Sequence, residues 1–186
     1  MAYPSVEETL PLVLEFDPRG DARAERSQRQ TINLLELLRA PFDRSAFDPG
    51  HITASAVVLA PDREHVLLVF HEKLRRWLQP GGHCEPSDQD VRATARRETR
   101  EETGIALSNK DSLALAGIDV HDIPAAGSEP SHRHHDLCFL AQATLHQIEA
   151  MHSSDKIVWC PIIELDRYDV DLPLRACLAR SLHVTL

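Results

Sequence analysis

Aromatic residues and cysteines are scarce in this sequence of 186 residues: aromatics make up 5% of it, and there are four cysteines. The cysteines lie far apart and form no Cys-x-x-Cys pair, which argues against a zinc knuckle or a dithiol redox motif. We therefore expect four free thiols, and any that are buried should pack as small apolar side chains.

Long apolar runs are also missing, since no segment approaches the roughly 20 residues that span a bilayer. Residues 1–20 contain acidic side chains and no basic leader before an apolar stretch, so we expect no secretory signal. A cytoplasmic protein without a membrane partner is the expectation. The net charge of −9 argues against general binding to a nucleic acid polymer, which needs a basic surface.

The remaining composition, 42% hydrophobic and 26% charged, is that of a globular protein with room for one domain. We expect residues 1–48 to form an N-terminal helical arm. Residues 5–16 start with a Ser-x-x-Glu cap and form a short helix despite Pro11. Residues 21–40 place apolar side chains at helical spacing, so a second helix should end before Pro41.

From residue 49 onward the pattern is typical of strands followed by a helix and more strands. Apolar segments rich in β-branched residues predict strands at 52–60, 66–70, 113–120, 135–145 and 156–160. Segments with helix-forming composition predict helices at 88–103, capped by Gly104, and at 173–184. The predicted fold class is α+β, an α/β/α layered domain that covers residues 49–186.

Three carboxylates gather on the first of these helices. Glu98, Glu101 and Glu102 are three and four residues apart and therefore share one face near the negative end of the helix dipole. A solvated face with ion pairs to neighbouring arginines is one explanation. A magnesium site is the other, because hard divalent ions take carboxylate oxygens as ligands and leave positions for water and phosphates.

The segment around these glutamates favours the magnesium site. Residues 82–105 resemble the Nudix box, whose pattern is Gly, five residues, Glu, seven residues, Arg-Glu-aliphatic-x-Glu-Glu-x-Gly-aliphatic. The match falls on Arg97, Glu98, Glu101, Glu102, Gly104 and Ile105. The segment departs from the pattern in its loop, where one extra residue leaves Asp88, Glu85 and Asp90 as rivals for the first acid, and at Thr99, where an aliphatic residue is usual.

The resemblance implies a Nudix-like sandwich with a mixed β-sheet and a divalent-metal-dependent pyrophosphohydrolase. Its substrate would be a small molecule with a diphosphate linkage: a nucleoside diphosphate joined to another group. Glu98, Glu101, Glu102 and the carbonyl of Gly82 would bind magnesium, for which manganese could substitute. Glu101 or Glu102 would also orient or deprotonate the attacking water, while Arg97 would hold a glutamate in place.

Further residues that could contact the substrate flank the box and lie in a histidine-rich segment. The candidates are Trp77, His83, Glu85, Asp88, His121 and His134. In an extended strand His132, His134 and Asp136 would face one way, and the apolar residues after His135 the other. His134, with His121 or His132, would contact phosphate or form a second metal site for softer ions. The alternative is that these histidines are surface or hydrogen-bonded residues of a long loop.

Two other functions fit the resemblance less closely. Isopentenyl-diphosphate isomerases share the Nudix scaffold and carry Cys-Gly-His where this chain has Gly81-Gly82-His83, so their catalytic cysteine is missing; Cys84 lies beyond the histidine. A non-catalytic nucleotide-binding module would be indicated by loss of a helical glutamate, and none is lost. A homodimer formed through the apolar side of the N-terminal arm is a further expectation.

Overall fold

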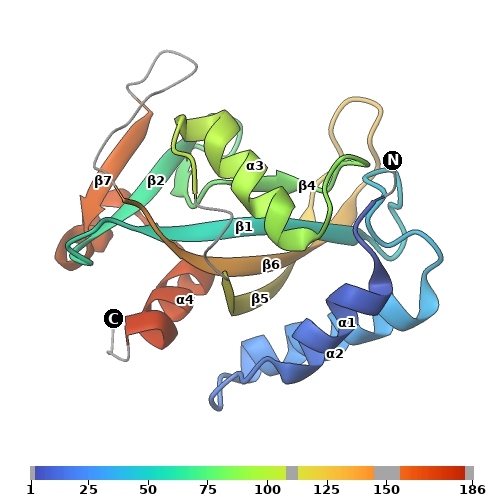
Figure 1. Cartoon of the computed structure of the whole chain (residues 1–186). Helices are drawn as coiled ribbons and strands as arrows, with labels where there is room; N and C mark the ends of the chain where they lie inside the picture. Colours follow the sequence, from blue (N-terminus) through green and yellow to red (C-terminus); the bar gives the residue numbers. More distant parts are fainter. Residues whose placement is uncertain (1–2, 108–112, 145–155, 183–186) are drawn as a thin grey trace.

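The structure is a computed structural model that describes residues 3–107, 113–144 and 156–182. The elements follow in the order α1 (Val6–Glu15), α2 (Ala22–Leu37), β1 (His51–Leu59), β2 (His65–His71), β3 (Arg76–Leu78), β4 (Gly81–His83), α3 (Val91–Thr103), β5 (Ala114–Ile123), β6 (His132–Gln142), β7 (Ile157–Pro161), a 3-10 helix at Ile162–Tyr168, and α4 (Leu172–Leu182). Figure 1 shows α3 on one side of the sheet and α4 on the other. This arrangement confirms the predicted α+β layered fold.

The seven-stranded sheet is mixed, and β1 occupies its centre. This strand runs parallel to β6 along its whole length and antiparallel to β2 and β4 on its other side. Strand β5 lies antiparallel to β6 at one edge, while β2 also pairs with β3 and β7. The mixed sheet that the resemblance implies is therefore present.

Alternation along β1 separates two hydrophobic clusters, because successive side chains of a strand point to opposite faces. Ile52, Ala54, Ala56 and Val58 join the cluster that includes residues of α3, whereas Val57 and Leu59 join the cluster that includes residues of α4. The remaining β1 side chains, His51, Thr53 and Ser55, share the face of Val57 by the same alternation. The polar side chains of the strand thus lie opposite α3.

The two helices of the N-terminal arm form as the sequence predicts and pack onto the domain. The Ser5 side chain accepts a bond from the amide of Glu8 at the start of α1, which tolerates Pro11 inside it, and Asp21 caps α2. Buried side chains from both helices, including Val13 and Leu34, join the cluster beneath α3. The division at residue 48 stays a proposal, since arm and domain share one core.

Four predicted boundaries are wrong by three residues. Helix α2 ends at Leu37 rather than residue 40, and β5 ends at Ile123 rather than residue 120. The other two errors have identifiable reasons. Helix α3 begins at Val91 rather than residue 88, because Asp90 is its N-cap and accepts a bond from Ala93. Strand β6 begins at His132 rather than 135, since the polar histidines that suggested a loop pair with β5. The predicted ends at residues 145 and 184 lie outside the described residues. The four cysteines are free and buried.

The end of α3 provides a test of local backbone geometry. Gly104 has a φ of 75° in the left-handed region, and its amide bonds to the carbonyl of Arg100. Replacing it with alanine adds a Cβ that this conformation disfavours, so we expect Gly104→Ala to lower the free energy of unfolding by about 1 kcal/mol. Chemical denaturation measures the change. The exposed Arg100→Ala variant is the control and should change the free energy of unfolding by less than about 0.5 kcal/mol. Equal effects of the two substitutions would contradict the role of Gly104 as the cap of α3.

Candidate active site

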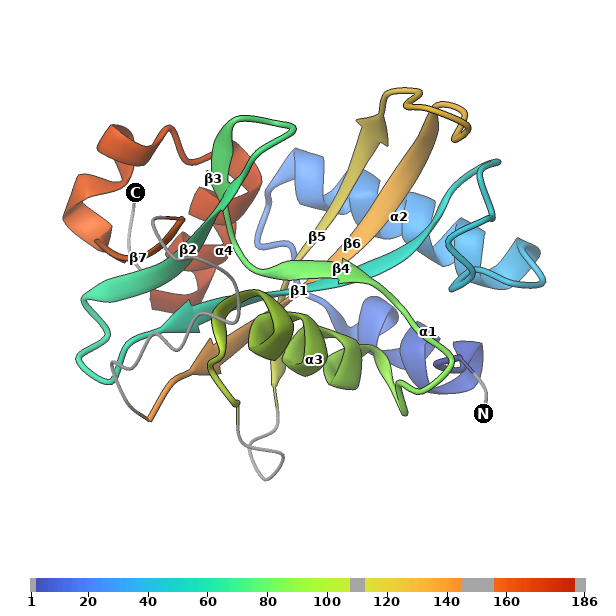
Figure 2. The ribbon, with the colours of Figure 1, turned by 90° about the horizontal axis from the view of Figure 1, so that it is seen from above.

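The glutamates of α3 meet a glycine strand that lets the helix approach the sheet closely. Figure 2 shows β4 running alongside β1, next to α3. A Cβ at Gly82 would lie 2.7 Å from the carboxylate carbon of Glu98, so any larger residue there would push the Glu98 carboxylate out of its present position. The amide of Gly81 donates to the carboxylate of Glu102 at 3.1 Å. The glycine pair, for which the sequence predicted no strand, is therefore part of a short strand that contacts two of the three acids.

Arg97 holds this part of the helix together. Its guanidinium donates to Glu98 at 2.8 Å and to Glu101 at 3.1 Å. It also donates to the backbone carbonyl of His83 at 2.7 Å and to both carboxylate oxygens of Asp88 at 2.9 and 3.0 Å. Arg97 thus positions two glutamates of the cluster against the loop and β4.

The three rival loop acids occupy different places. Asp88 is buried and accepts bonds from the Glu85 amide and the Thr94 hydroxyl, in addition to Arg97. Glu85 remains exposed, with its carboxylate 4.0 Å from Arg97, and Asp90 caps the helix. The structure therefore puts Asp88 in the position that anchors Arg97, and leaves Glu85 at the rim of the site.

The electrostatics of the carboxylates fit a bound cation. Burial raises the pKa of Glu98, although Arg97 opposes this shift. Glu102 is exposed at the surface, yet desolvation by the surrounding protein, together with the charges of Glu98 and Glu101, raises its pKa to about 7. Three acids on one helical turn, with oxygen donors only, match the preference of magnesium. These three carboxylate side chains fit the divalent ion that the resemblance implies.

The opposite face of the sheet carries a second polar group that sequence reasoning left out. Asp136 of β6 is buried and accepts bonds from Thr53 at 3.0 Å and Ser55 at 2.6 Å, both on β1. Burial raises the pKa of this carboxyl. The alternation along the strand predicts that Asp136 shares a face with His134. It does not predict the partners of Asp136, which are 81 and 83 residues away in the chain. Only the pairing of β1 with β6 brings them together.

The histidine candidates gather on this same face. The ring of His134 lies 5.0 Å from that of His83 and 5.6 Å from that of His121. Burial lowers the pKa of His83 to about 4 and that of His134 to about 2, so both rings are neutral at pH 7. His121 instead bonds to the carboxylate of Asp119 at 3.0 Å. His51 joins the group without having been a candidate from the sequence.

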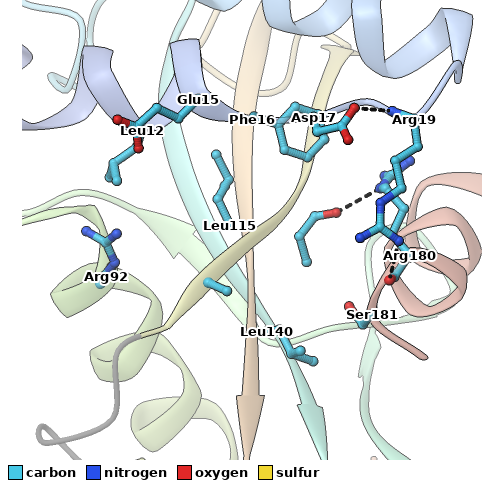
Figure 3. Close-up of a pocket in the computed structure, with 12 residues that line it drawn as sticks. Leu12, Glu15, Phe16, Asp17, Arg19, Arg92, Leu115, Leu140, Arg180 and Ser181 are labelled. Atoms are coloured by element: carbon cyan, nitrogen blue, oxygen red, sulfur yellow. Dashed lines mark hydrogen bonds between the residues drawn. The ribbon is translucent and has the colours of Figure 1, made fainter. Parts of the chain in front are cut away.

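Trp77 and a surface pocket lie in other surroundings. The Trp77 ring packs edge-on against Phe70 and Tyr168 in the cluster that includes α4. A pocket of about 420 Å³ is lined by residues of α1 and the segment after it, of α3, β5, β6 and α4, among them Phe16, Arg92 and Arg180 (Figure 3). None of the candidate site residues lines this pocket. The candidate site is thus identified by the contacts and charges of its residues, and not by this pocket.

Comparison with known proteins identifies the family. A family model described as the NUDIX domain matches residues 49–180. A 36-residue stretch is 68% identical to the human mitochondrial coenzyme A diphosphatase NUDT8, covering 19% of this chain and 15% of that protein. A 45-residue stretch is 47% identical to mouse asymmetrical bis(5'-nucleosyl)-tetraphosphatase, covering 24% of this chain and 30% of that protein. The alignments thus span less than a third of either curated relative.

Solved structures share the fold at low sequence identity. The NUDIX domain of Shewanella oneidensis NrtR, crystallised with ADP ribose, superposes with a TM-score of 0.54 at 19% identity, covering 77% of this chain and 94% of that one. The C. elegans Ap4A hydrolase gives 0.50 at 19% identity, covering 71% of this chain and 96% of that one. The chain belongs to the Nudix hydrolase family, as the box in residues 82–105 predicts.

Proposed function

We propose that this chain is a divalent-metal-dependent pyrophosphohydrolase that cleaves the diphosphate linkage of a nucleoside diphosphate joined to another group. The observation that carries the proposal is the packing of Glu98 and Glu102 against the glycine strand, with Arg97 holding Glu98 and Glu101. The two curated relatives support the substrate class, because coenzyme A and dinucleoside tetraphosphates, after which they are named, both contain nucleotide anhydrides.

Each residue of the site has a distinct part in this proposal. Glu98, Glu101 and Glu102 would hold magnesium or manganese together with the carbonyl of Gly82. When bound, the metal would lower the pKa of a water molecule and neutralise charge on the phosphoryl oxygens. Glu101 or Glu102 would orient that water. Arg97 keeps Glu98 close to β4 and would not contact the substrate, since its donors already bind protein groups.

Observations on two residues make the alternative functions less favourable. Cys84 is buried, and burial raises the pKa of its thiol to about 12, so it is a poor replacement for the cysteine of an isomerase. A non-catalytic module that only binds nucleotide needs no cluster of ion-binding acids, yet Glu98, Glu101 and Glu102 are all retained. A hydrolase therefore explains more of the observed site residues than an isomerase or a non-catalytic binding module does.

No helix in the described part of the chain combines the length and apolar character needed to cross a membrane. A cytoplasmic location and a homodimer remain predictions, and the human relative is named a mitochondrial enzyme.

A substrate panel tests the proposed function. Coenzyme A, dinucleoside polyphosphates, ADP-ribose, nucleotide sugars and nucleoside triphosphates are incubated with magnesium or manganese, and products are separated by anion exchange. Cleavage in H₂¹⁸O then shows which phosphorus receives the water. We expect one class to give two phosphorylated products, one of them a nucleotide with a single phosphate at its 5' position. Nucleotide binding without turnover would instead favour the binding module, and conversion of isopentenyl diphosphate to its isomer would favour the isomerase.

The raised pKa of Glu102 gives the proposal a pH dependence. The proton competes with the metal for this carboxylate below its pKa of about 7. We therefore expect the magnesium concentration for half-maximal rate to be steady above pH 8 and to rise by about tenfold per pH unit well below pH 7. Rates measured at pH 6, 7 and 8 against magnesium concentration check this. Equal half-saturation at pH 6 and pH 8 would show that Glu102 does not bind the ion.

A further inference from the structure

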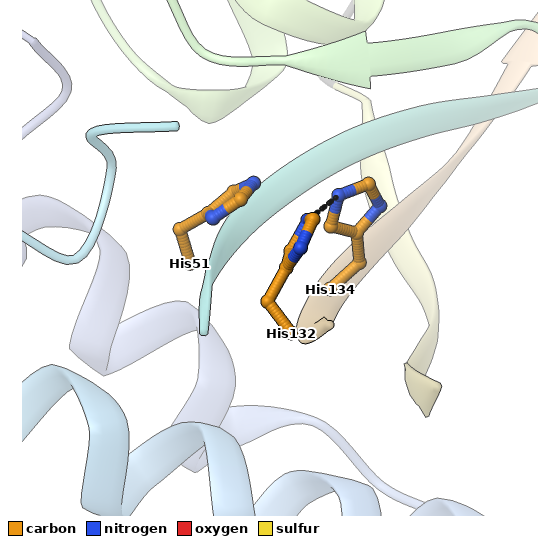
Figure 4. A group of neighbouring side chains, drawn as sticks. All are labelled: His51, His132 and His134. Carbon is orange, nitrogen blue, oxygen red and sulfur yellow. Dashed lines mark hydrogen bonds between the residues drawn. The ribbon is translucent and has the colours of Figure 1, made fainter. Parts of the chain in front are cut away.

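Three histidines converge where β1 and β6 begin, on the face of β1 opposite α3 (Figure 4). His51 pairs with His134 across the two parallel strands, and His132 precedes His134 by two residues on the same face. One ligand nitrogen from each ring lies within 4.8 Å of the other two. We propose that His51, His132 and His134 bind one zinc ion at a site separate from the α3 glutamates.

Backbone carbonyls fix which nitrogen of two rings is free. Nδ1 of His51 lies 3.2 Å from the carbonyl of Ala46, and Nδ1 of His132 lies 2.9 Å from the carbonyl of Pro130. A carbonyl only accepts, so each Nδ1 must carry the proton and donate it. Both Nε2 atoms therefore carry lone pairs. A ligating histidine is usually oriented in this way, by donating its other N–H to a carbonyl.

Two of the ring nitrogens already lie at the separation of zinc ligands, and the third is within 4.8 Å of both. Nε2 of His132 and Nε2 of His134 are 3.3 Å apart. Two nitrogens bound tetrahedrally to zinc at about 2.0–2.1 Å are separated by about 3.3–3.4 Å. A hydrogen bond donated by His134 also suits this distance, but it leaves the third histidine unexplained. Nε2 of the fully buried His51 has no hydrogen-bond partner among the described residues. A buried nitrogen without a partner is costly, and a metal would satisfy it.

The donor set distinguishes this site from the acidic one. Three imidazoles suit zinc and related transition ions, whereas the carboxylates of α3 suit magnesium. Three histidines leave a fourth tetrahedral position, as in zinc sites that keep a water. The ring of His83 lies close to two of the three histidines, 5.1 Å from the ring of His51 and 5.0 Å from that of His134. The ion would join the first residue of β1 to the first residues of β6 and so stabilise the fold.

Metal content and cobalt spectroscopy test the proposal without relying on turnover. The purified chain is loaded with Zn²⁺ in excess Mg²⁺, freed of unbound ion by gel filtration and assayed by mass spectrometry. We expect one zinc per chain, a higher Tm than in the metal-free protein, and, with Co²⁺ instead, the intense visible bands of tetrahedral nitrogen coordination. His132→Gln and His134→Gln should each weaken zinc binding by at least about 100-fold.

Two matched variants separate the sites. His71→Gln changes an exposed histidine and should keep the zinc, and Glu102→Gln should keep it while losing magnesium-dependent hydrolysis if the proposed function is correct. Zinc retained by His132→Gln and His134→Gln but lost by Glu102→Gln would place the ion at α3 and overturn the proposal. If both histidine variants fail to fold, the wild-type cobalt spectrum decides, because weak octahedral bands alone would also overturn it.

Discussion

Glu102→Gln and Glu101→Gln are each expected to lower turnover of the preferred substrate by about 10²- to 10⁴-fold, the range typical of losing a group that activates water. Glutamine keeps the shape of the side chain and can still accept the bond that Gly81 donates to Glu102. It removes the charge that a divalent ion needs. Initial rates at saturating magnesium measure the effect, and circular dichroism checks that the fold is intact.

The same chemical change at an exposed site is the control. Glu36→Gln lies on the exposed side of α2 and should leave the rate unchanged. Without metal, Glu102→Gln should fold at least as well as the wild type, since it removes one of three neighbouring negative charges. Near-normal rates in both the Glu101 and the Glu102 variants would rule out the roles proposed for these residues.

Arg97→Met is expected to destabilise the protein most among the surface-accessible substitutions on α3. Asp88 is buried with a side-chain exposure of 4%, and Arg97 bonds to both of its carboxylate oxygens. Removing one partner of a buried ion pair leaves an uncompensated charge, which costs about 3–5 kcal/mol. The free energy of unfolding from urea denaturation measures the loss. Magnesium-dependent turnover should fall as well, because Glu98 and Glu101 lose their shared donor.

A double-mutant cycle shows whether Asp88 causes the loss. Replacing the acid too, in Arg97→Met with Asp88→Asn, removes the unpaired charge, so the double variant should lose less stability than the sum of the single variants. Arg100→Met, one turn along on the exposed face, should change the unfolding free energy by less than about 0.5 kcal/mol. Strict additivity of the two single effects would contradict the coupling.

The acidic helix could be predicted because its information is local. Glu98, Glu101 and Glu102 follow from a three- and four-residue spacing, and Gly104 ends the helix by its own conformational preference. Strands β1 and β2 were predicted for the same reason, since β-branched apolar runs show in the sequence directly. These features require no knowledge of which segments are neighbours.

The polar face of the sheet could not be predicted, because it depends on strand register. Asp136 meets Thr53 and Ser55 only through the parallel pairing of β1 with β6. His51 gave no sign of a role, since a single histidine at the start of an apolar strand has no partner within reach along the chain. Its place beside His134 comes from contacts more than eighty residues apart. Asp88 was left undecided because hydrogen bonds, rather than spacing, place it against Arg97.

The dependence of turnover on the metal tests the central claim most directly. The best substrate of the panel is assayed with wild type and Glu102→Gln, first as purified, then after removal of divalent ions with EDTA, and again after magnesium is restored. The α3 site predicts that wild-type turnover falls to background without metal and returns with magnesium, while the variant stays near background throughout. Wild-type turnover that persists after complete removal of divalent ions would contradict it.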